Sequence, residues 1–127
     1  DCHVILRGGK FPNFDAVSVE AACRESSAVN VSCRLMIDAS HGNSQKKPEN
    51  QVPVTQDVAA QVAGGDERIF GMMIESHLVA GRQDLVAGQP LTYGQSITDG
   101  CISWEDSVPL LEVLAMAVRQ RRLKRGD

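Results

Sequence analysis

Three short apolar runs, at residues 3–6, 33–37 and 69–74, constrain the fold of this chain more than any other feature of its sequence. Each run is rich in β-prone side chains, is nearly continuous rather than alternating, and is followed by glycine or polar residues. Short continuous runs of this kind are typical of strands that are buried on both faces, as in parallel sheets. The runs therefore predict three neighbouring parallel strands.

Helical patterns separate these runs. Asp15 can cap a helix that extends to about Val29, and a second helix is predicted over residues 53–63, with the two following glycines as its stop. A last helix is expected to begin near Ser103 or Ser107. Its predicted buried residues are Leu111, Leu114, Ala115 and Val118. A strand followed by a helix, three times over, predicts an α/β fold built on a parallel sheet or barrel.

A polar residue follows each predicted strand. Arg7, His41 and Glu75 stand at matching places, 34 residues apart, although the three units share too little sequence to form a repeat. Active sites of parallel α/β folds form at the carboxyl ends of the strands, so we expect these side chains to meet. If the third strand continues to residue 77, His77 faces the same way as Glu75, because side chains alternate along a strand.

The set formed by His41, Glu75 and Asp99 offers one imidazole and two carboxylates, which suit a divalent metal such as Mn, Fe, Co or Zn. Each residue also has an ordinary interpretation: a histidine satisfied within its loop, a carboxylate paired with a cation, and a helix cap or turn former. Glu75 resists that interpretation most, because burying an unpaired carboxylate at the end of an apolar strand is costly. The pattern therefore predicts a metal-dependent α/β enzyme.

Two further residues are candidates for the same edge of the sheet. Arg7 precedes Gly8 and Gly9, where backbone amides can approach an anion, so an anion site and a plain surface cation are equally good interpretations. Cys101 lies two residues after Asp99 and could be a fourth ligand, although chance adjacency outweighs ligation.

The composition excludes several classes of protein. A chain of 127 residues with 43% hydrophobic content and a net charge of −3 fits one small soluble domain and lacks the overall basic charge expected for nucleic-acid binding. No apolar run reaches the roughly 18–20 residues of a membrane span. The basic segment at residues 119–125 is interpreted as a solvated helix end that complements the helix dipole, rather than as an RNA- or phosphate-binding tail.

The cysteine spacing indicates the cellular compartment of the protein, and the first residues indicate whether the sequence is a fragment. Cys2, Cys23, Cys33 and Cys101 are widely scattered and form no CxxC pair, so we expect packed, reduced thiols of a cytoplasmic protein rather than a zinc finger. The chain begins at Asp1 with neither an initiator methionine nor a signal-peptide pattern, and it enters an apolar strand almost at once. We therefore expect a fragment of a longer protein.

Four stretches, in order along the chain, resemble the type I 3-deoxy-D-arabino-heptulosonate 7-phosphate (DAHP) synthases: HVILRGGKFPNF, LMIDASHGNS, GMMIESHLVAG and YGQSITDGCISWEDS. The resemblance runs from the first residue to the end of the last helix. The family fold is a (β/α)8 TIM barrel, which takes about 250 residues. By this resemblance, residues 1–127 are the C-terminal portion of a single barrel domain, with strands six to eight and their helices, and the N-terminal part of the barrel is absent.

The resemblance also implies the site. The family holds its divalent metal with a Cys, a His, a Glu and an Asp, and His41, Glu75 and Asp99 match the last three of these. The Cys belongs to a strand outside this sequence. His41 and Asp99 are also the expected catalytic residues, and Arg7 matches an arginine that binds phosphoenolpyruvate.

The family reaction and its supporting residues follow from the same resemblance. Asp38 and His77 lie close to the matched ligands in sequence, and we expect them to orient a ligand or the substrate. The family condenses phosphoenolpyruvate with D-erythrose 4-phosphate and water to give DAHP and phosphate, the first step of the shikimate pathway. The implied protein is a cytoplasmic transferase of aromatic amino acid biosynthesis, a homo-oligomer at full length, with no nucleic-acid or membrane partner.

Some family motifs are missing from the sequence. The segments that carry the family's lysine, its other phosphoenolpyruvate-binding arginines and its Lys-Pro-Arg-Thr motif for erythrose 4-phosphate do not occur here. The chain alone is therefore expected to be inactive and poorly folded, with open sheet edges. The alternatives are another metal-dependent barrel, such as an octulosonate-phosphate synthase or a divalent-metal aldolase, and a non-catalytic half-barrel that acts as an interaction module.

Overall fold

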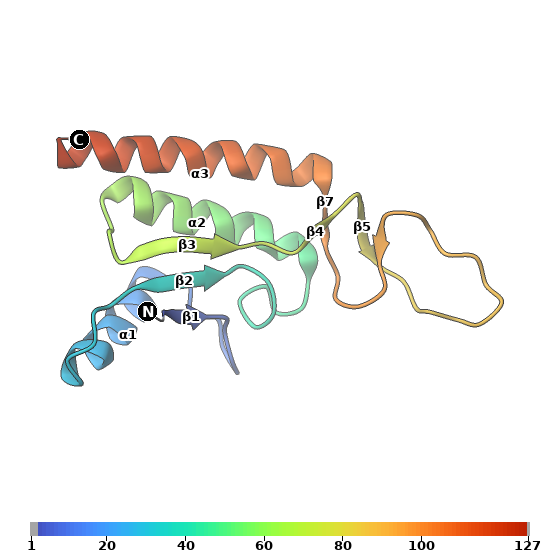
Figure 1. Ribbon diagram of the computed structural model, residues 1–127, viewed down its shortest axis with the longest axis horizontal. Helices are drawn as coiled ribbons and strands as arrows, with labels where there is room; N and C mark the ends of the chain where they lie inside the picture. The colour runs from blue at the N-terminus through green and yellow to red at the C-terminus, as the bar shows by residue number, and fades with distance from the viewer. Residues whose placement is uncertain (1–2, 127) are drawn as a thin grey trace.

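A three-stranded parallel sheet forms the centre of the molecule, as Figure 1 shows. The computed structural model describes residues 3–126. The sheet consists of β1 (Val4–Leu6), β2 (Leu35–Asp38) and β3 (Ile69–Met73), in the order β1-β2-β3, and both pairs are parallel. The predicted α/β class and the three predicted parallel strands are thus confirmed, with strand bounds within two residues of the apolar runs.

Local chemistry sets the ends of the helices. Within the described residues these are α1 (Ala16–Ala28), the short 3-10 helix η1 (Pro48–Asn50), α2 (Gln51–Gly64) and α3 (Trp104–Arg125). Asp15 caps α1 by accepting hydrogen bonds from the amides of Val17 and Ser18. Gly65, with a φ of 111°, ends α2 in the left-handed region that glycine adopts most easily. Ser103 caps α3, which confirms the earlier of its two predicted starts.

One hydrophobic core joins all three strands of this sheet to α1, α2 and α3. Leu35 and Ile37 of β2 are completely buried within it. The buried core residues are Leu6, Val19, Cys23, Leu35, Ile37, Val58, Ala59, Val62, Ile69 and Ala117. Helix α3 lies along α2, and α2 lies beside β3 (Figure 1). The helices therefore stabilise the sheet through one continuous core, which fixes the strand ends relative to one another.

The outer strands are less buried than the sequence predicted. Most of β2 is buried, but Val4 and Ile5 of β1 are 44% and 49% exposed, and Phe70 of β3 is also exposed. The prediction of burial on both faces is therefore wrong for β1 and β3. The reason is their position, because each is an edge strand with a single neighbour among the described residues.

Helix α3 buries only part of the predicted stripe, since Leu114 and Val118 pack against the core and Leu111 and Ala115 do not. Leu111 is 51% exposed and Ala115 is exposed, whereas Leu110 and Ala117 are buried. The other two residues of the predicted set are half-buried. Arg121 of the same helix adds a polar contact, because it donates hydrogen bonds of 2.9 and 2.8 Å to two main-chain carbonyls around the start of β3. The apolar pattern of the helix alone did not contain this contact.

After β3 the chain leaves the sheet and forms a projecting arm (Figure 1). β4 (Ser76–His77) pairs with β7 (Ile102–Ser103), and β5 (Val79–Arg82) pairs with β6 (Gln95–Ser96). The residues between β5 and β6 extend furthest from the sheet. These two pairs of short strands return the chain to the carboxyl end of β3.

Cys23 in α1 and Cys33, just before β2, form a disulfide, with their Cα atoms 5.0 Å apart. The expectation of reduced thiols is wrong for this pair, because the turn after α1 brings the two residues together. Cys101 is a buried free thiol, as expected, and Cys2 lies outside the described residues. None of the described helices is long and apolar enough to cross a membrane.

Candidate metal and anion site

The carboxyl ends of the three parallel strands meet at one edge of the sheet, and a cavity of about 620 Å³ opens there. Arg7 follows β1, His41 follows β2 and Glu75 follows β3. The arm supplies Asp99, from the segment between β6 and β7. All four of these residues line the cavity, so the structure brings together the side chains that the sequence singled out from four distant segments.

His41, Glu75 and Asp99 converge on one point of this cavity. The Nε2 atom of His41 lies 3.8 Å from Oε1 of Glu75 and 3.6 Å from Oδ2 of Asp99, and the three donor atoms lie within 4.8 Å of one another. Donor atoms that share an ion at about 2.1 Å are separated by roughly 3–4 Å. One imidazole nitrogen and two carboxylate oxygens at this spacing fit a divalent metal ion.

Asp38 orients the imidazole ring. Its Oδ2 atom lies 2.8 Å from Nδ1 of His41, and its Oδ1 atom accepts a hydrogen bond of 2.8 Å from the amide of Ser40. Asp38 is buried, so this carboxylate is held firmly. A ring that donates from Nδ1 to Asp38 leaves the lone pair of Nε2 facing two carboxylates, which is the tautomer that a metal ligand needs.

Two polar residues that the sequence did not single out support the site: Ser40 lines the cavity, and Asn43 lies behind it. Ser40 donates a hydrogen bond of 2.6 Å to Oε2 of Glu75, which leaves Oε1 to face the imidazole. Asn43 is buried and donates to the carbonyls of Leu6 (3.0 Å) and Asp38 (2.7 Å), so it ties the end of β1 to the end of β2. Serine and asparagine are common in polar loops, so their residue types alone carried no signal.

Arg7 lines the cavity beside a close contact between two backbone turns. Its carbonyl accepts hydrogen bonds from the amides of Gly42 (3.0 Å) and Asn43 (3.2 Å). A Cβ atom on Gly8 would lie 2.4 Å from the carbonyl carbon of Gly42, and one on Gly42 would lie 2.6 Å from that of Gly8. Side chains therefore do not fit at either position, and the contact keeps the arginine turn against the histidine turn.

Two more cations, Lys46 and Arg82, line the same cavity. Arg82 donates a hydrogen bond of 2.8 Å to the carbonyl of Thr98, next to Asp99 in the chain. Arg82 also forms an ion pair with Asp84. Together with Arg7, these residues place three cationic side chains in the lining that contains Glu75 and Asp99. The sequence did not single out either cation, because isolated basic residues in polar loops are common.

His77 and Cys101 lie outside the ligand cluster. His77 is exposed, and its Nδ1 atom accepts a hydrogen bond of 2.8 Å from the amide of Leu78. The shared orientation predicted for Glu75 and His77 required one continuous strand, whereas β3 ends before both residues. Cys101 donates from Sγ to the carbonyl of Asp99 at 3.7 Å, and burial raises the pKa of its thiol. The supporting role of His77 stays a prediction.

The fold and the site together define an α/β protein with a candidate divalent-metal site at the carboxyl edge of a parallel sheet. Residues 1–112 match the DAHP synthetase I family, and the chain belongs to this family. The resemblance carried by the four sequence stretches is thereby confirmed.

Individual relatives carry consistent names. The chain is 54% identical over 123 residues to the phospho-2-dehydro-3-deoxyheptonate aldolase of Haemophilus influenzae, a match that covers 96% of this chain and 34% of that protein. It is 51% identical over 122 residues to the Phe-sensitive aldolase of Escherichia coli (strain K12), with coverage of 96% and 35%. The solved structure of the aldolase from Francisella tularensis SCHU S4 matches with a TM-score of 0.89 and 48% identity, over 94% of this chain and 35% of the other. The chain thus spans about a third of the length of these relatives.

Proposed function

We propose that this chain is the C-terminal portion of a DAHP synthase, which condenses phosphoenolpyruvate with D-erythrose 4-phosphate and water to give DAHP and phosphate. The observation that carries the proposal is the meeting of Arg7 with the three candidate metal ligands in one cavity. The shared name of the relatives, phospho-2-dehydro-3-deoxyheptonate aldolase, supports the same chemistry. Within this proposal, β1, β2 and β3 are strands six, seven and eight of a (β/α)8 barrel.

His41, Glu75 and Asp99 would hold a divalent ion of the Mn, Fe, Co or Zn kind, because nitrogen and carboxylate donors suit these metals. Such an ion supplies Lewis-acid polarisation of the aldehyde oxygen of erythrose 4-phosphate. Asp38 keeps the proton of His41 on Nδ1, and Ser40 holds one carboxylate oxygen of Glu75, so both donor atoms are aimed at one point. The fourth ligand, the family's Cys, belongs to the part of the barrel outside this chain.

The cations of the cavity would bind the anionic substrates. Arg7 offers a planar, permanently charged group to the carboxylate or phosphate of phosphoenolpyruvate, and Lys46 and Arg82 add to the positive field. In the reaction, C3 of the enol phosphate attacks the aldehyde carbon, water adds at C2, and cleavage of a C–O bond releases phosphate. We assign contact with the aldehyde to His41 and Asp99. The side chain of Asp99 is 69% exposed.

The proposal also sets a cellular role. A DAHP synthase performs the first step of the shikimate pathway, so the protein would be a cytoplasmic enzyme of aromatic amino acid biosynthesis. We propose that the full-length enzyme is a homo-oligomer. Sedimentation equilibrium of the full-length protein would test the assembly, and a monomer at assay concentrations would contradict it.

A chimera tests the activity directly. Residues 1–127 replace the matching segment of the Phe-sensitive relative from Escherichia coli, and the purified protein is assayed with Mn2+, phosphoenolpyruvate and erythrose 4-phosphate. We expect release of phosphate and formation of DAHP, and neither product when a pentose phosphate replaces erythrose 4-phosphate. Turnover with the pentose phosphate and none with erythrose 4-phosphate would favour an octulosonate-phosphate synthase instead.

Substitution of Glu75 tests the metal role within the chimera. We expect Glu75→Gln to lower kcat about 100-fold or more, since loss of a partner outside the ligand shell already costs about 10–100-fold. Glu112→Gln, on an exposed position of α3, is the matched control and is expected to keep full activity. A chimera that remains fully active with Glu75→Gln would contradict the metal-ligand role of Glu75, and a parent chimera without turnover would favour a non-catalytic interaction module.

A further inference from the structure

Glu75 lies where the sheet no longer holds the chain. β3 ends at Met73 and β4 begins at Ser76, so this candidate ligand is on a short link between two strands. The main chain of such a link has polar groups that the strand ladder does not satisfy, and they need other partners. The structure provides these partners through Gln51, the first residue of α2.

Gln51 binds both polar groups of Glu75's main chain. The amide of Glu75 donates to Oε1 of Gln51 at 2.8 Å, and Nε2 of Gln51 donates to the carbonyl of Glu75 at 3.0 Å. Two reciprocal bonds of this kind reproduce the pairing that a neighbouring antiparallel strand would offer. The same carbonyl also accepts a hydrogen bond of 3.0 Å from the amide of Ile102 in β7. The main chain of Glu75 is therefore held from two elements at once.

Gln51 is itself firmly fixed. Gln51 is fully buried, and its main-chain carbonyl accepts a hydrogen bond of 2.7 Å from the hydroxyl of Thr55, which is also fully buried. Val54 and Val58 bury the same side of α2. The amide side chain suits this task because it both accepts and donates, whereas an ionised glutamate in the same place could only accept.

Ser40 acts on the other end of Glu75. Its hydroxyl donates to Oε2 of that carboxylate at 2.6 Å, and its own amide donates to Oδ1 of Asp38 at 2.8 Å. Ser40 is buried and lies two residues after the end of β2. The carboxylate of Glu75 is thus held from the β2 side, while its main chain is held from α2.

We propose that Gln51 and Ser40 are positioning residues that set the place of Glu75 for metal binding. The inference rests on the metal site of the proposed function and adds the residues that preorganise its glutamate. Ligands of a metal site must stay within about 0.5 Å of the productive geometry. Both residues act through Glu75, because the side chain of Gln51 bonds to its main chain and the hydroxyl of Ser40 bonds to its carboxylate.

The experiment measures binding of Mn2+ alone by isothermal titration calorimetry in the chimera. Gln51→Met keeps the side-chain volume but loses both hydrogen bonds, and we expect it to raise the Kd for Mn2+ about 10–100-fold. Ser40→Ala is expected to raise the Kd about tenfold. The matched controls are Gln61→Met, which removes a hydrogen bond between α2 and Phe14, and Ser27→Ala on α1. Both controls should leave the Kd unchanged.

A merely structural role gives a different pattern. Thermal unfolding of the metal-free proteins would then show a lower Tm for Gln51→Met and for Gln61→Met alike, with no change in the Kd for Mn2+. Unchanged Kd values in both Gln51→Met and Ser40→Ala overturn the proposal. If Gln51→Met does not fold, Ser40→Ala decides, because water in the cavity can replace the lost hydroxyl and the protein should remain folded.

The outcomes also separate this inference from the proposed function. A chimera that binds Mn2+ but makes no DAHP refutes the function, while the effect of Gln51→Met on metal binding still supports the positioning role. If the chimera is active and neither substitution changes its Kd for Mn2+, the positioning role is refuted and the proposed function stands. A chimera that binds no Mn2+ refutes both.

Discussion

The contact between Gly8 and Gly42 shows how single residues set the dimensions of the site. Gly8 has a φ of 71°, in the left-handed region, and a Cβ atom there would lie 2.4 Å from the backbone of Gly42. A side chain would therefore push apart the turn that carries Arg7 and the turn that carries His41. The two glycines keep the anion side and the metal side of the cavity within reach of one substrate.

Substitution of Gly8 tests this arrangement. We expect Gly8→Ala to lower the free energy of unfolding by about 2–5 kcal/mol, since overpacking costs roughly 1–3 kcal/mol and a left-handed alanine about 1–2 kcal/mol. Urea unfolding of the chimera would measure it. Gly9→Ala is the control, because a Cβ atom there meets nothing within 4 Å. Equal losses in the two variants would contradict the close-contact argument.

At the scale of elements, an ion-pair network holds the end of the sheet that lies away from the site. Arg68, just before β3, donates to Asp66 in the turn after α2 at 2.8 Å and to Glu20 of α1. The hydrogen bond from Arg68 is the main reason that the pKa of Asp66 lies below its ordinary 3.8. The network therefore joins α1, the end of α2 and β3 through one guanidinium group.

This lowered pKa predicts a stability that depends on pH. The carboxylate of Asp66 binds its proton less readily in the folded protein than in the unfolded one, so its stabilising contribution is complete above pH 3.8 and is lost as the pH falls through the folded-state value. We expect Asp66→Asn to be less stable than the parent at neutral pH and to approach it in acid.

Urea unfolding between neutral pH and strong acid would measure this convergence. Asp57→Asn removes a carboxylate from the exposed part of α2 and controls for the general loss of one negative charge. A stability difference for Asp66→Asn that stays constant down to strong acid would contradict the linkage to this carboxylate.

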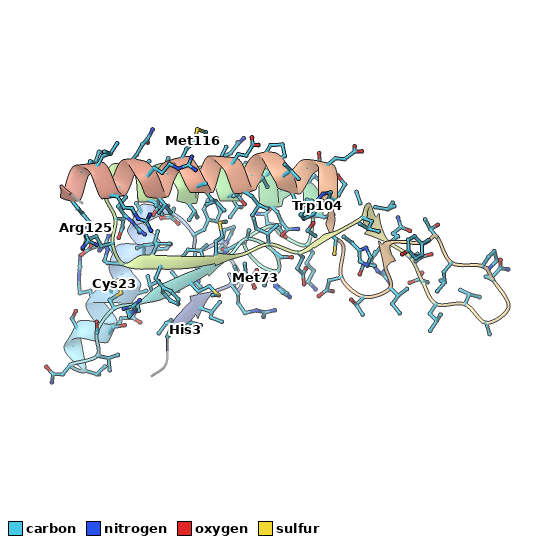
Figure 2. All side chains as sticks on the ribbon, turned by 45° about the horizontal axis from the view of Figure 1, so that its top comes forward. His3, Cys23, Met73, Trp104, Met116 and Arg125 are labelled. Atoms are coloured by element: carbon cyan, nitrogen blue, oxygen red, sulfur yellow. A yellow bond between two sulfur atoms is a disulfide. The ribbon has the colours of Figure 1, made fainter. Side chains whose placement is uncertain are left out.

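At the scale of the whole molecule, large apolar side chains remain exposed on several elements. Val4 and Ile5 of β1, Trp104 and Met116 of α3, and Tyr93 in the arm are all exposed. Figure 2 shows Met116 on the side of α3 that faces away from the sheet. Val4 and Ile5 are adjacent on an edge strand, and an exposed apolar edge strand is typical of a surface that another strand covers. The missing barrel strands of the proposed function would supply such a cover.

The isolated chain is therefore expected to be inactive and to bind a hydrophobic dye such as ANS. Co-expression with the N-terminal two-thirds of the Escherichia coli relative should lower dye binding and restore DAHP formation, because the sheet edges and apolar faces then find partners. Fluorescence and turnover assays on both preparations would measure this. Turnover by the 127-residue chain alone would show that the prediction is wrong.

The sequence by itself determined the elements and part of the site. Apolar runs, the cap at Asp15 and the stop at Gly65 depend on neighbours along the chain, so a local pattern was enough to predict them. The carboxyl-end rule of parallel sheets then predicted that Arg7, His41 and Glu75 meet, because strands of one direction share one edge. For α3 the same local pattern was only partly right, because the face that a helix buries also depends on the distant elements that it packs against.

Only the tertiary structure decided how the site is held. Gln51 and Ser40 bind Glu75 from 24 and 35 residues away, and the paired strands of the arm carry Asp99 back to the cavity. The disulfide between Cys23 and Cys33 likewise depends on the turn after α1. Hydrogen bonds between distant residues produce no periodic pattern in a sequence. A buried glutamine that hydrogen-bonds to a candidate ligand residue has the same residue type as a glutamine in a solvated loop.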